Sequence, residues 1–361
     1  MSLLAVVVGL VLLAVGGELV VRGASRLAVS VGIRPVVVGL TVVAFGTSLP
    51  ELAVTVGSVM DGSPDVAVGN IVGSNIYNIL LVLGMGAIVA PLIVQQRIVR
   101  ADVPLLIGVS LLFWALAADG RIDRLDGLPL LLLLLGYVGV AVRNGRRERR
   151  DIRDEYEESL PPGPRTGERM VMLALFIAGG LLVLVAGSQI LVAGASDIAR
   201  SLGVSELVIG LTVVAIGTTM PEIMTTIVAV VRDQRDIAVG NVVGSNLFNL
   251  LGVIGIGAFV APNGIPVAPA ALAFDIPIMV VVAVALLPVT FVGSAIRRWE
   301  GAVFVAYAVA YTTYLVLDAT DHRLAAGFTF VMGAFVLPLT VLTFLTVVTR
   351  EVRARRAPGS G

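Results

Sequence analysis

The chain has 361 residues, of which 57% are hydrophobic and only 14% charged, and its formal net charge is zero. Soluble domains carry roughly 25% charged residues, so this composition excludes an ordinary soluble protein. Cysteine is absent and histidine occurs once, which excludes disulfides, thiolate metal sites and clusters of imidazole ligands. A metal site in this chain must use oxygen ligands, which favour hard cations such as Ca²⁺, Mg²⁺ or Na⁺.

Apolar runs of about 20 residues, long enough to cross a bilayer as a helix, recur along the whole chain. Runs such as "LPLLLLLLGYVGVAV" do not alternate between apolar and polar residues, which excludes a transmembrane barrel. The first run follows no basic residue and shows no clear cleavage site, so we interpret it as a retained span. We expect eleven spans, at residues 2–21, 35–60, 66–90, 102–118, 127–142, 170–190, 206–231, 237–260, 268–292, 301–317 and 325–349.

The distribution of arginine, the only basic residue type besides the single histidine, predicts the orientation of these spans. With the N-terminus outside, 21 of the 25 arginines fall in cytoplasmic segments and 4 fall outside. Cytoplasmic loops retain Arg and Lys, so the distribution supports an outside N-terminus, a cytoplasmic C-terminus and an odd number of spans. The one sizeable polar segment, residues 143–169, is charged and then rich in proline and glycine, as is typical of a cytoplasmic linker.

An internal repeat divides the chain into two halves. Residues 39–91 align without a gap to residues 210–262, with 30 identities in 53 positions. "VRGASRLA" at 21–28 also matches "VAGASDIA" at 192–199, and "DVP" at 102–104 resembles "DIP" at 275–277, so the repeat extends over most of five spans. Because five is odd, the copies must lie in opposite orientations, which is typical of secondary transporters. We predict an all-α polytopic membrane protein with two inverted five-helix repeats, residues 1–142 and 170–318, and an extra transmembrane helix with a basic tail in residues 319–361.

Each repeat places polar side chains on one face of two neighbouring spans. A spacing of four residues keeps such side chains on the same helical face. Lipid penalises polar faces, so we expect these faces to meet between the two halves. The first span of each pair contributes Thr47, Glu51 and Thr55, or Thr218, Glu222 and Thr226; the next contributes Asn70, Ser74 and Asn78, or Asn241, Ser245 and Asn249.

A proline precedes each of the two glutamates. Pro50 and Pro221 lack an N–H group and crowd the carbonyl four residues earlier, so we expect each Gly-Thr-Ser/Thr-x-Pro segment to unwind locally. Carbonyls of residues 44–47 and 215–218 would then point at a cation, since irregular backbone is tolerated at membrane depth where it lines a cavity. Ca²⁺ takes about 6–8 oxygen ligands, and two glutamates would neutralise one Ca²⁺. Taken singly, the prolines could serve only to kink a helix and the glycines only to pack helices closely. The joint recurrence of all these motifs at the same spacing in both halves favours a functional site.

These motifs resemble the α-repeats of sodium/calcium exchangers in the cation/calcium antiporter superfamily. Gly-Thr-Ser/Thr-x-Pro-Glu followed by Gly-Asn-x-x-Gly-Ser-Asn occurs twice, as in a prokaryotic member. The resemblance implies that Glu51 and Glu222 are central ligands shared between Ca²⁺ and Na⁺. It also implies flanking Na⁺ sites made by Thr47, Thr218, Ser74 and Ser245 with the carbonyls of Ala44 and Ala215, and a centre lined by Asn78 and Asn249. Secondary candidates are Ser48, Thr219, Asn70 and Asn241.

Two features depart from this family pattern. The family usually has ten spans, and many relatives carry Asp at the position of Asn249, so this chain has one fewer central carboxylate. That difference argues against K⁺ co-transport and leaves both Na⁺ and H⁺ open as the counter-ion. Glu18, whose partner in the repeat is Gln189, is either a helix-packing group or a proton-linked group.

The prediction for function is therefore a secondary active antiporter, and not an enzyme. It would exchange Ca²⁺ for Na⁺ across the prokaryotic cytoplasmic membrane by alternating access, with no cofactor and no nucleic-acid partner. A Ca²⁺/H⁺ antiporter that uses the same paired glutamates is the alternative. An intramembrane enzyme with paired carboxylates and a non-transporting cation sensor are more distant possibilities.

Overall fold

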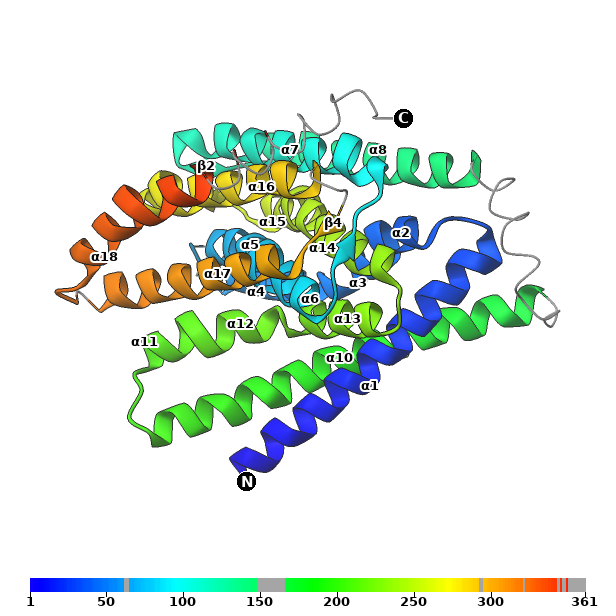
Figure 1. Ribbon diagram of the computed structural model, residues 1–361, viewed down its shortest axis with the longest axis horizontal. Coiled ribbons are helices and arrows are strands. Elements are labelled where there is room, and N and C mark those ends of the chain that lie inside the picture. The colour runs from blue at the N-terminus through cyan, green and yellow to red at the C-terminus, as the bar shows by residue number, and fades with distance from the viewer. Residues whose placement is uncertain are drawn as a thin grey trace, which may run out of the picture.

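The computed structural model describes residues 1–61, 65–147, 166–291, 295–320 and 322–342, together with residues 345 and 349. The described chain is almost wholly helical (Figure 1). Within it, ten helices are long and apolar enough to cross a membrane, or eleven when the bent pair Gly210–Thr218 and Met220–Val231 counts as one span. The predicted all-α polytopic class and its number of spans are confirmed. Residues 148–165 of the predicted linker, and the tail beyond residue 349, lie outside the described residues.

The first half contains five spans, three of which are built from several helical pieces. They are, in chain order, α1 (Ser2–Val31); α2 (Pro35–Val38), η1 (Gly39–Val43), α3 (Ala44–Thr47) and α4 (Leu49–Met60); α5 (Asp65–Tyr77), η2 (Asn78–Leu83) and α6 (Gly84–Val89); η3 (Ile98–Asp102), α7 (Val103–Leu116) and η4 (Ala117–Asp119); and α8 (Arg124–Arg147).

The second half repeats this order, and one further span follows it. Its elements are α10 (Thr166–Ser201); α11 (Glu206–Ile209), η6 (Gly210–Val214), α12 (Ala215–Thr218) and α13 (Met220–Val231); α14 (Arg235–Leu247), η7 (Phe248–Val253) and α15 (Ile254–Val260); η8 (Ala271–Asp275) and α16 (Ile276–Phe291); α17 (Arg298–Ala319); and α18 (Ala325–Val331) with η9 (Met332–Val336). The π-helical turns η1, η2 and η3 recur as η6, η7 and η8. Single π turns occur frequently at functional sites.

Two short antiparallel ribbons join the halves to each other. β1 (Leu92–Ile93) pairs with β4 (Ala295–Ile296), and β2 (Arg121–Ile122) pairs with β3 (Ile265–Pro266). Each ribbon therefore pairs a loop of one half with a loop of the other. The arginine distribution assigns the β1–β4 ribbon to the cytoplasmic side and the β2–β3 ribbon to the outside, as two oppositely oriented repeats require.

The long helices α1 and α10 lie together along one face of the molecule (Figure 1). Glycines spaced by seven residues let their backbones touch: a Cβ added to Gly16 would lie 2.8 Å from the carbonyl oxygen of Gly180, and one added to Gly9 would lie 2.8 Å from that of Gly187. Small residues of this kind support close helix packing in membranes. Both helices are longer than the predicted spans 2–21 and 170–190, because the contact continues past those limits.

The second and third spans of each half form the centre of the molecule. In the most apolar window, 67% of Pro35–Met60, 78% of Val66–Val89 and 89% of Arg235–Val260 is buried, compared with 17% of Arg298–Ala319. Helices that carry the repeated polar motifs are therefore shielded from lipid by the others. The eleventh span packs on α17, where the Tyr307 hydroxyl donates to Thr340 Oγ1 at 2.6 Å.

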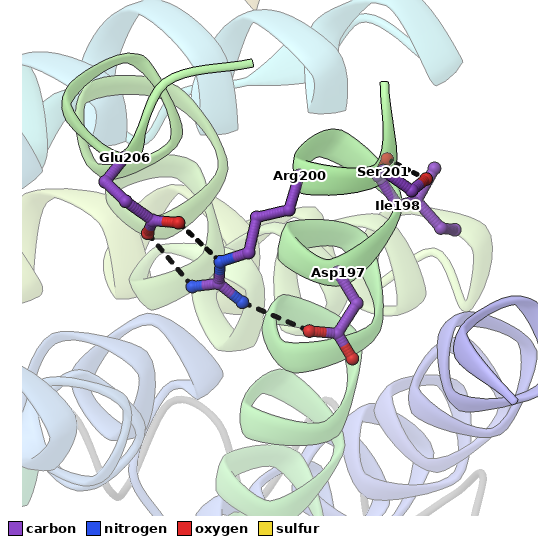
Figure 2. Close-up of polar contacts among 5 residues, drawn as sticks. All are labelled: Asp197, Ile198, Arg200, Ser201 and Glu206. Carbon is purple, nitrogen blue, oxygen red and sulfur yellow. Dashed lines mark hydrogen bonds and ion pairs between the residues drawn. The ribbon is translucent and has the colours of Figure 1, made fainter. Parts of the chain in front are cut away.

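A charged turn connects α10 to α11 at the predicted outer face, and Figure 2 shows its contacts. Arg200 donates from Nε to Glu206 Oε1 at 2.6 Å and from the neighbouring amino group to Oε2 at 3.1 Å, and it also reaches Asp197 at 3.1 Å. These side chains are exposed, so the pair adds little to stability. Its effect is to tie the end of α10 to the start of α11.

Candidate ion-binding site

Both glutamates lie in the first turn of a helix that follows a break in the chain. The break is a single residue in each half, Ser48 (φ −82°, ψ 1°) and Thr219 (φ −85°, ψ −2°). In the second half the helical axes on the two sides of the break differ by 49°. Glu51 and Glu222 then sit near the N-termini of α4 and α13, where the positive end of the helix dipole favours negative charge.

The predicted local unwinding of each Gly-Thr-Ser/Thr-x-Pro segment is confined to Ser48 and Thr219, and it does not extend to residues 44–47 and 215–218, whose carbonyls we expected to point at a cation. Both stretches remain helical, as α3 and α12, and the Ala44 carbonyl still accepts the Ser48 N–H at 3.1 Å. Pro221 does remove the usual donor to Gly217, but the Ser188 hydroxyl of α10 replaces it at 2.5 Å. A single residue of altered geometry is sufficient to accommodate each proline, so the backbone does not need to open further.

The two glutamate side chains are completely buried, each with 0% exposure. Within the described chain, none of their four carboxylate oxygens accepts a hydrogen bond, although the two carboxyl groups interact electrostatically. Burial of an unpaired carboxylate is so unfavourable that buried charges are normally paired or bound to a metal. The arrangement is therefore suited to a cation held between the two halves.

Hydroxyl and amide groups of both halves surround this pair. Thr47 Oγ1 lies 3.2 Å from Ser245 Oγ and 3.1 Å from Asn241 Oδ1. Thr47 also interacts with Glu222, and Ser74 interacts with Glu51, without hydrogen bonds of good geometry. The structure thus brings the predicted polar faces of the two repeats together.

The equivalent threonines of the second repeat are arranged differently. Thr218 is only half-buried and donates to the Ala215 carbonyl at 3.0 Å, whereas Thr219 is fully buried and donates to the same oxygen at 3.3 Å. Ser48, the counterpart of Thr219, is 3% exposed, and its hydroxyl has no partner among the described residues. The secondary candidates Ser48 and Thr219 are therefore more deeply enclosed than Thr218.

Asparagines fill the remainder of the centre. Asn70 donates to the backbone carbonyl of Glu51 at 3.3 Å, so it supports the backbone of that glutamate. Asn78 and Asn249 are both 0% exposed, and the Oδ1 atom of each has no partner within the described chain. These two oxygens are available to an ion.

Sequence reasoning missed two residues of this network, Asn75 and Asn246. The Asn75 amide donates to the Asn246 carbonyl oxygen at 3.3 Å, and the Asn246 amide donates to the Asn75 carbonyl oxygen at 3.4 Å. The signal was present, since both occupy equivalent positions directly after Ser74 and Ser245. Their placement one residue off the predicted polar face concealed their role.

The chemical character of the site follows from this set of ligands. Among the described residues, no group of three or more His, Cys, Asp or Glu side chains could hold a metal ion. The site offers two carboxylates and many neutral oxygens instead, a set that suits hard cations and not transition metals.

Inverted repeats, helices broken at the same position in each half and a buried polar centre between them define an integral membrane protein of the secondary-transporter class. The family profile described as "Sodium/calcium exchanger protein" matches residues 1–143 and 172–317. The chain belongs to this family of membrane transporters, which are not enzymes and which move small inorganic cations. The match ends before the eleventh span.

Relatives in both sequence and structure agree with this assignment. CaxA of Alkalimonas amylolytica, which is named as an antiporter, is 38% identical over 319 residues, covering 87% of this chain and 98% of CaxA. The inner membrane protein YrbG of Escherichia coli (strain K12) is 37% identical over 221 residues, covering 61% of this chain and 67% of YrbG. A solved structure of the sodium-calcium exchanger NCX_Mj, soaked with Na⁺ and Sr²⁺, matches with a TM-score of 0.72 at 29% identity over 85% of this chain and 96% of that chain.

Proposed function

We propose that this protein exchanges Ca²⁺ for Na⁺ across the cytoplasmic membrane by alternating access, with both ions bound around Glu51 and Glu222. One observation carries the proposal: two inverted helices bury a carboxylate pair whose oxygens have no hydrogen-bond partner in the described chain. The named function of NCX_Mj, and its soaking with Na⁺ and a divalent cation, support the choice of ions. The name of YrbG supports the choice of membrane.

Charge balance at the carboxylate pair explains why the exchange would be obligatory. Two charged carboxylates in a site of low dielectric constant repel each other and have lost their water. One Ca²⁺ or two Na⁺ would neutralise them. The site would then reorient readily when loaded and slowly when empty, which couples movement of one ion to movement of the other.

The test is Na⁺-gradient-driven uptake of ⁴⁵Ca²⁺ into proteoliposomes. Glu51→Gln and Glu222→Gln keep the side-chain size and remove one charge each, and we expect both to abolish exchange. Glu206→Gln is the matched control, because Glu206 is an exposed glutamate of the same half as Glu222. Exchange that survives both central substitutions would show that the site is wrongly assigned.

A Ca²⁺/H⁺ antiporter is the second candidate, and the same geometry supports it. Each buried carboxyl group lacks a hydrogen-bond donor within the described chain, so a proton could replace a cation as the neutralising charge. Ca²⁺ uptake driven by a pH gradient in the absence of Na⁺ would favour this candidate, and uptake that requires Na⁺ would exclude it.

A further inference from the structure

Four asparagines form a closed network where the two repeats meet. Besides the paired contacts of Asn75 and Asn246 with each other's backbone, Asn78 donates to Asn246 Oδ1 at 3.1 Å and Asn249 donates to Asn75 Oδ1 at 3.0 Å. The four side chains are 0–1% exposed. The network is two-fold symmetric, because every contact has an equivalent with the repeats exchanged.

The orientation of each amide follows from a group that cannot be reversed. A backbone carbonyl oxygen only accepts hydrogen bonds, so the atom of Asn75 that faces the Asn246 carbonyl must be Nδ2. Its Oδ1 must then face Asn249, which has to donate its own Nδ2 there. The Oδ1 atom of Asn249 therefore has no hydrogen-bond partner within the described chain. The same reasoning applied to Asn246 leaves the Oδ1 atom of Asn78 without a partner there.

We infer that Asn75 and Asn246 are positioning residues, which make Asn249 and Asn78 present oxygens and not N–H groups to the transported cation. This inference rests on the proposed function, since it concerns the same site. Asn78 lies one helical turn after Ser74, on the face that carries the Glu51 contact. A reversed amide would direct an N–H group at a cation, which replaces an attraction by a repulsion.

The inference also explains how the site works with asparagine in both halves. An amide side chain is an ion ligand only in one of its two orientations, whereas a carboxylate is a ligand in either. Orientation must therefore be enforced from outside the ligand shell, and removal of such outer partners typically costs roughly 10–100-fold in metal affinity.

The experiment uses Asn75→Leu in the full-length protein, with exchange kinetics as the readout. Leucine has a similar volume but neither donates nor accepts, so it releases the Asn249 amide. We expect the apparent KM for Ca²⁺ to rise roughly 10–100-fold, with a smaller change in the maximal rate. An unchanged KM would overturn the inference.

A rescue separates positioning from simple structural damage. Asn249→Asp removes the amide donor, so the ligand no longer needs orientation by Asn75. The double variant Asn75→Leu with Asn249→Asp should have a KM within a few-fold of that of Asn249→Asp alone. A KM that stays raised by the full factor would show that Asn75 has only a structural role and would overturn the inference.

The symmetry of the network supplies a second test, which applies even if Asn75→Leu does not fold. Asn246→Leu should raise the KM in the same way, and Asn78→Asp should rescue it. Failure of this inference is distinguishable from failure of the proposed function. If Glu51→Gln abolishes exchange but both leucine variants keep an unchanged KM, the positioning role is contradicted and the proposed site is not. Exchange that survives Glu51→Gln contradicts the site itself.

Discussion

Neighbouring glycines of α10 provide a matched test of the contact between α1 and α10. A Cβ added to Gly180 would lie 2.9 Å from the Gly16 carbonyl oxygen and 2.9 Å from Leu19 Cβ and Val20 Cγ2, whereas one added to Gly179 would meet nothing within 4 Å. Contacts of this type are ordinarily 3.4 Å or longer. Gly180→Ala therefore requires the two helices to shift apart, and Gly179→Ala does not.

The expected difference in stability comes from the packing alone. Overpacking costs about 1–3 kcal/mol. Replacing glycine by alanine within a helix contributes about 1 kcal/mol in the opposite direction, but both variants gain that amount, so it cancels in the comparison. We expect Gly180→Ala to be about 1–3 kcal/mol less stable than Gly179→Ala.

Thermal unfolding in detergent, followed through the fluorescence of Trp114 and Trp299, measures this difference. Gly180→Ala should unfold several degrees below Gly179→Ala, and Gly179→Ala should unfold at or above the temperature of the unmodified protein. Equal midpoints for the two variants would refute the close contact of α1 with α10.

Two further substitutions test contacts between the halves. Thr47→Val removes the hydroxyl that lies 3.2 Å from Ser245 Oγ and that we propose as a Na⁺ ligand. The Na⁺ concentration for half-maximal exchange should therefore rise, and an unchanged value would contradict this role of Thr47. Glu18→Gln removes the ion pair with Arg232, whose amino group lies 2.5 Å from Glu18 Oε1. This ion pair has no equivalent in the first repeat, so it favours one of the two membrane-facing states over the other. Because exposed pairs contribute less than about 1 kcal/mol, its removal should bring the apparent Ca²⁺ affinities at the two membrane faces closer by less than about fivefold. An effect of equal size at high salt would contradict the electrostatic cause.

The sequence alone predicted where the spans lie, how many there are, and that the polar faces of the two repeats meet. Apolar length sets the spans, and the four-residue spacing around Glu51 and Glu222 sets which side chains share a face. Both signals are local or repeat within the chain, so they can be extracted from one sequence. The assignment of these residues as ion ligands remains a prediction.

Contacts between distant segments could not be predicted in the same way. Ser188 lies on a span without a predicted role, and only the approach of α10 to α12 places its hydroxyl at the Gly217 carbonyl. The expected release of the Gly217 carbonyl toward an ion was wrong for this reason: a proline frees a carbonyl, but the sequence does not say which neighbour will satisfy it. Asn75 was missed because its partner is the backbone of the opposite half.

Differences between the two repeats would bias the proposed transport cycle toward one of its two conformations. The outward-facing and inward-facing states of an inverted-repeat transporter interchange the conformations of the halves, so identical halves would give both states equal free energy. The contacts that tie the α1–α10 pair to the rest of the second repeat include Ser188 with Gly217 and Glu18 with Arg232.

Neither contact can form in the first repeat. Ser188 corresponds to Gly17, which has no hydroxyl, and the counterparts of Glu18 and Arg232 are Gln189 and Asp61, which cannot form an ion pair. The conformation described by this structure therefore keeps two interactions that its inverted counterpart would lack. We expect it to be the more populated state, and because apparent affinity depends on the populated fraction of the binding-competent state, the two membrane faces should differ in their affinity for the same ion. The glutamates and asparagines of the site do not create this asymmetry, since they are identical in both repeats; it comes from the helices that surround them.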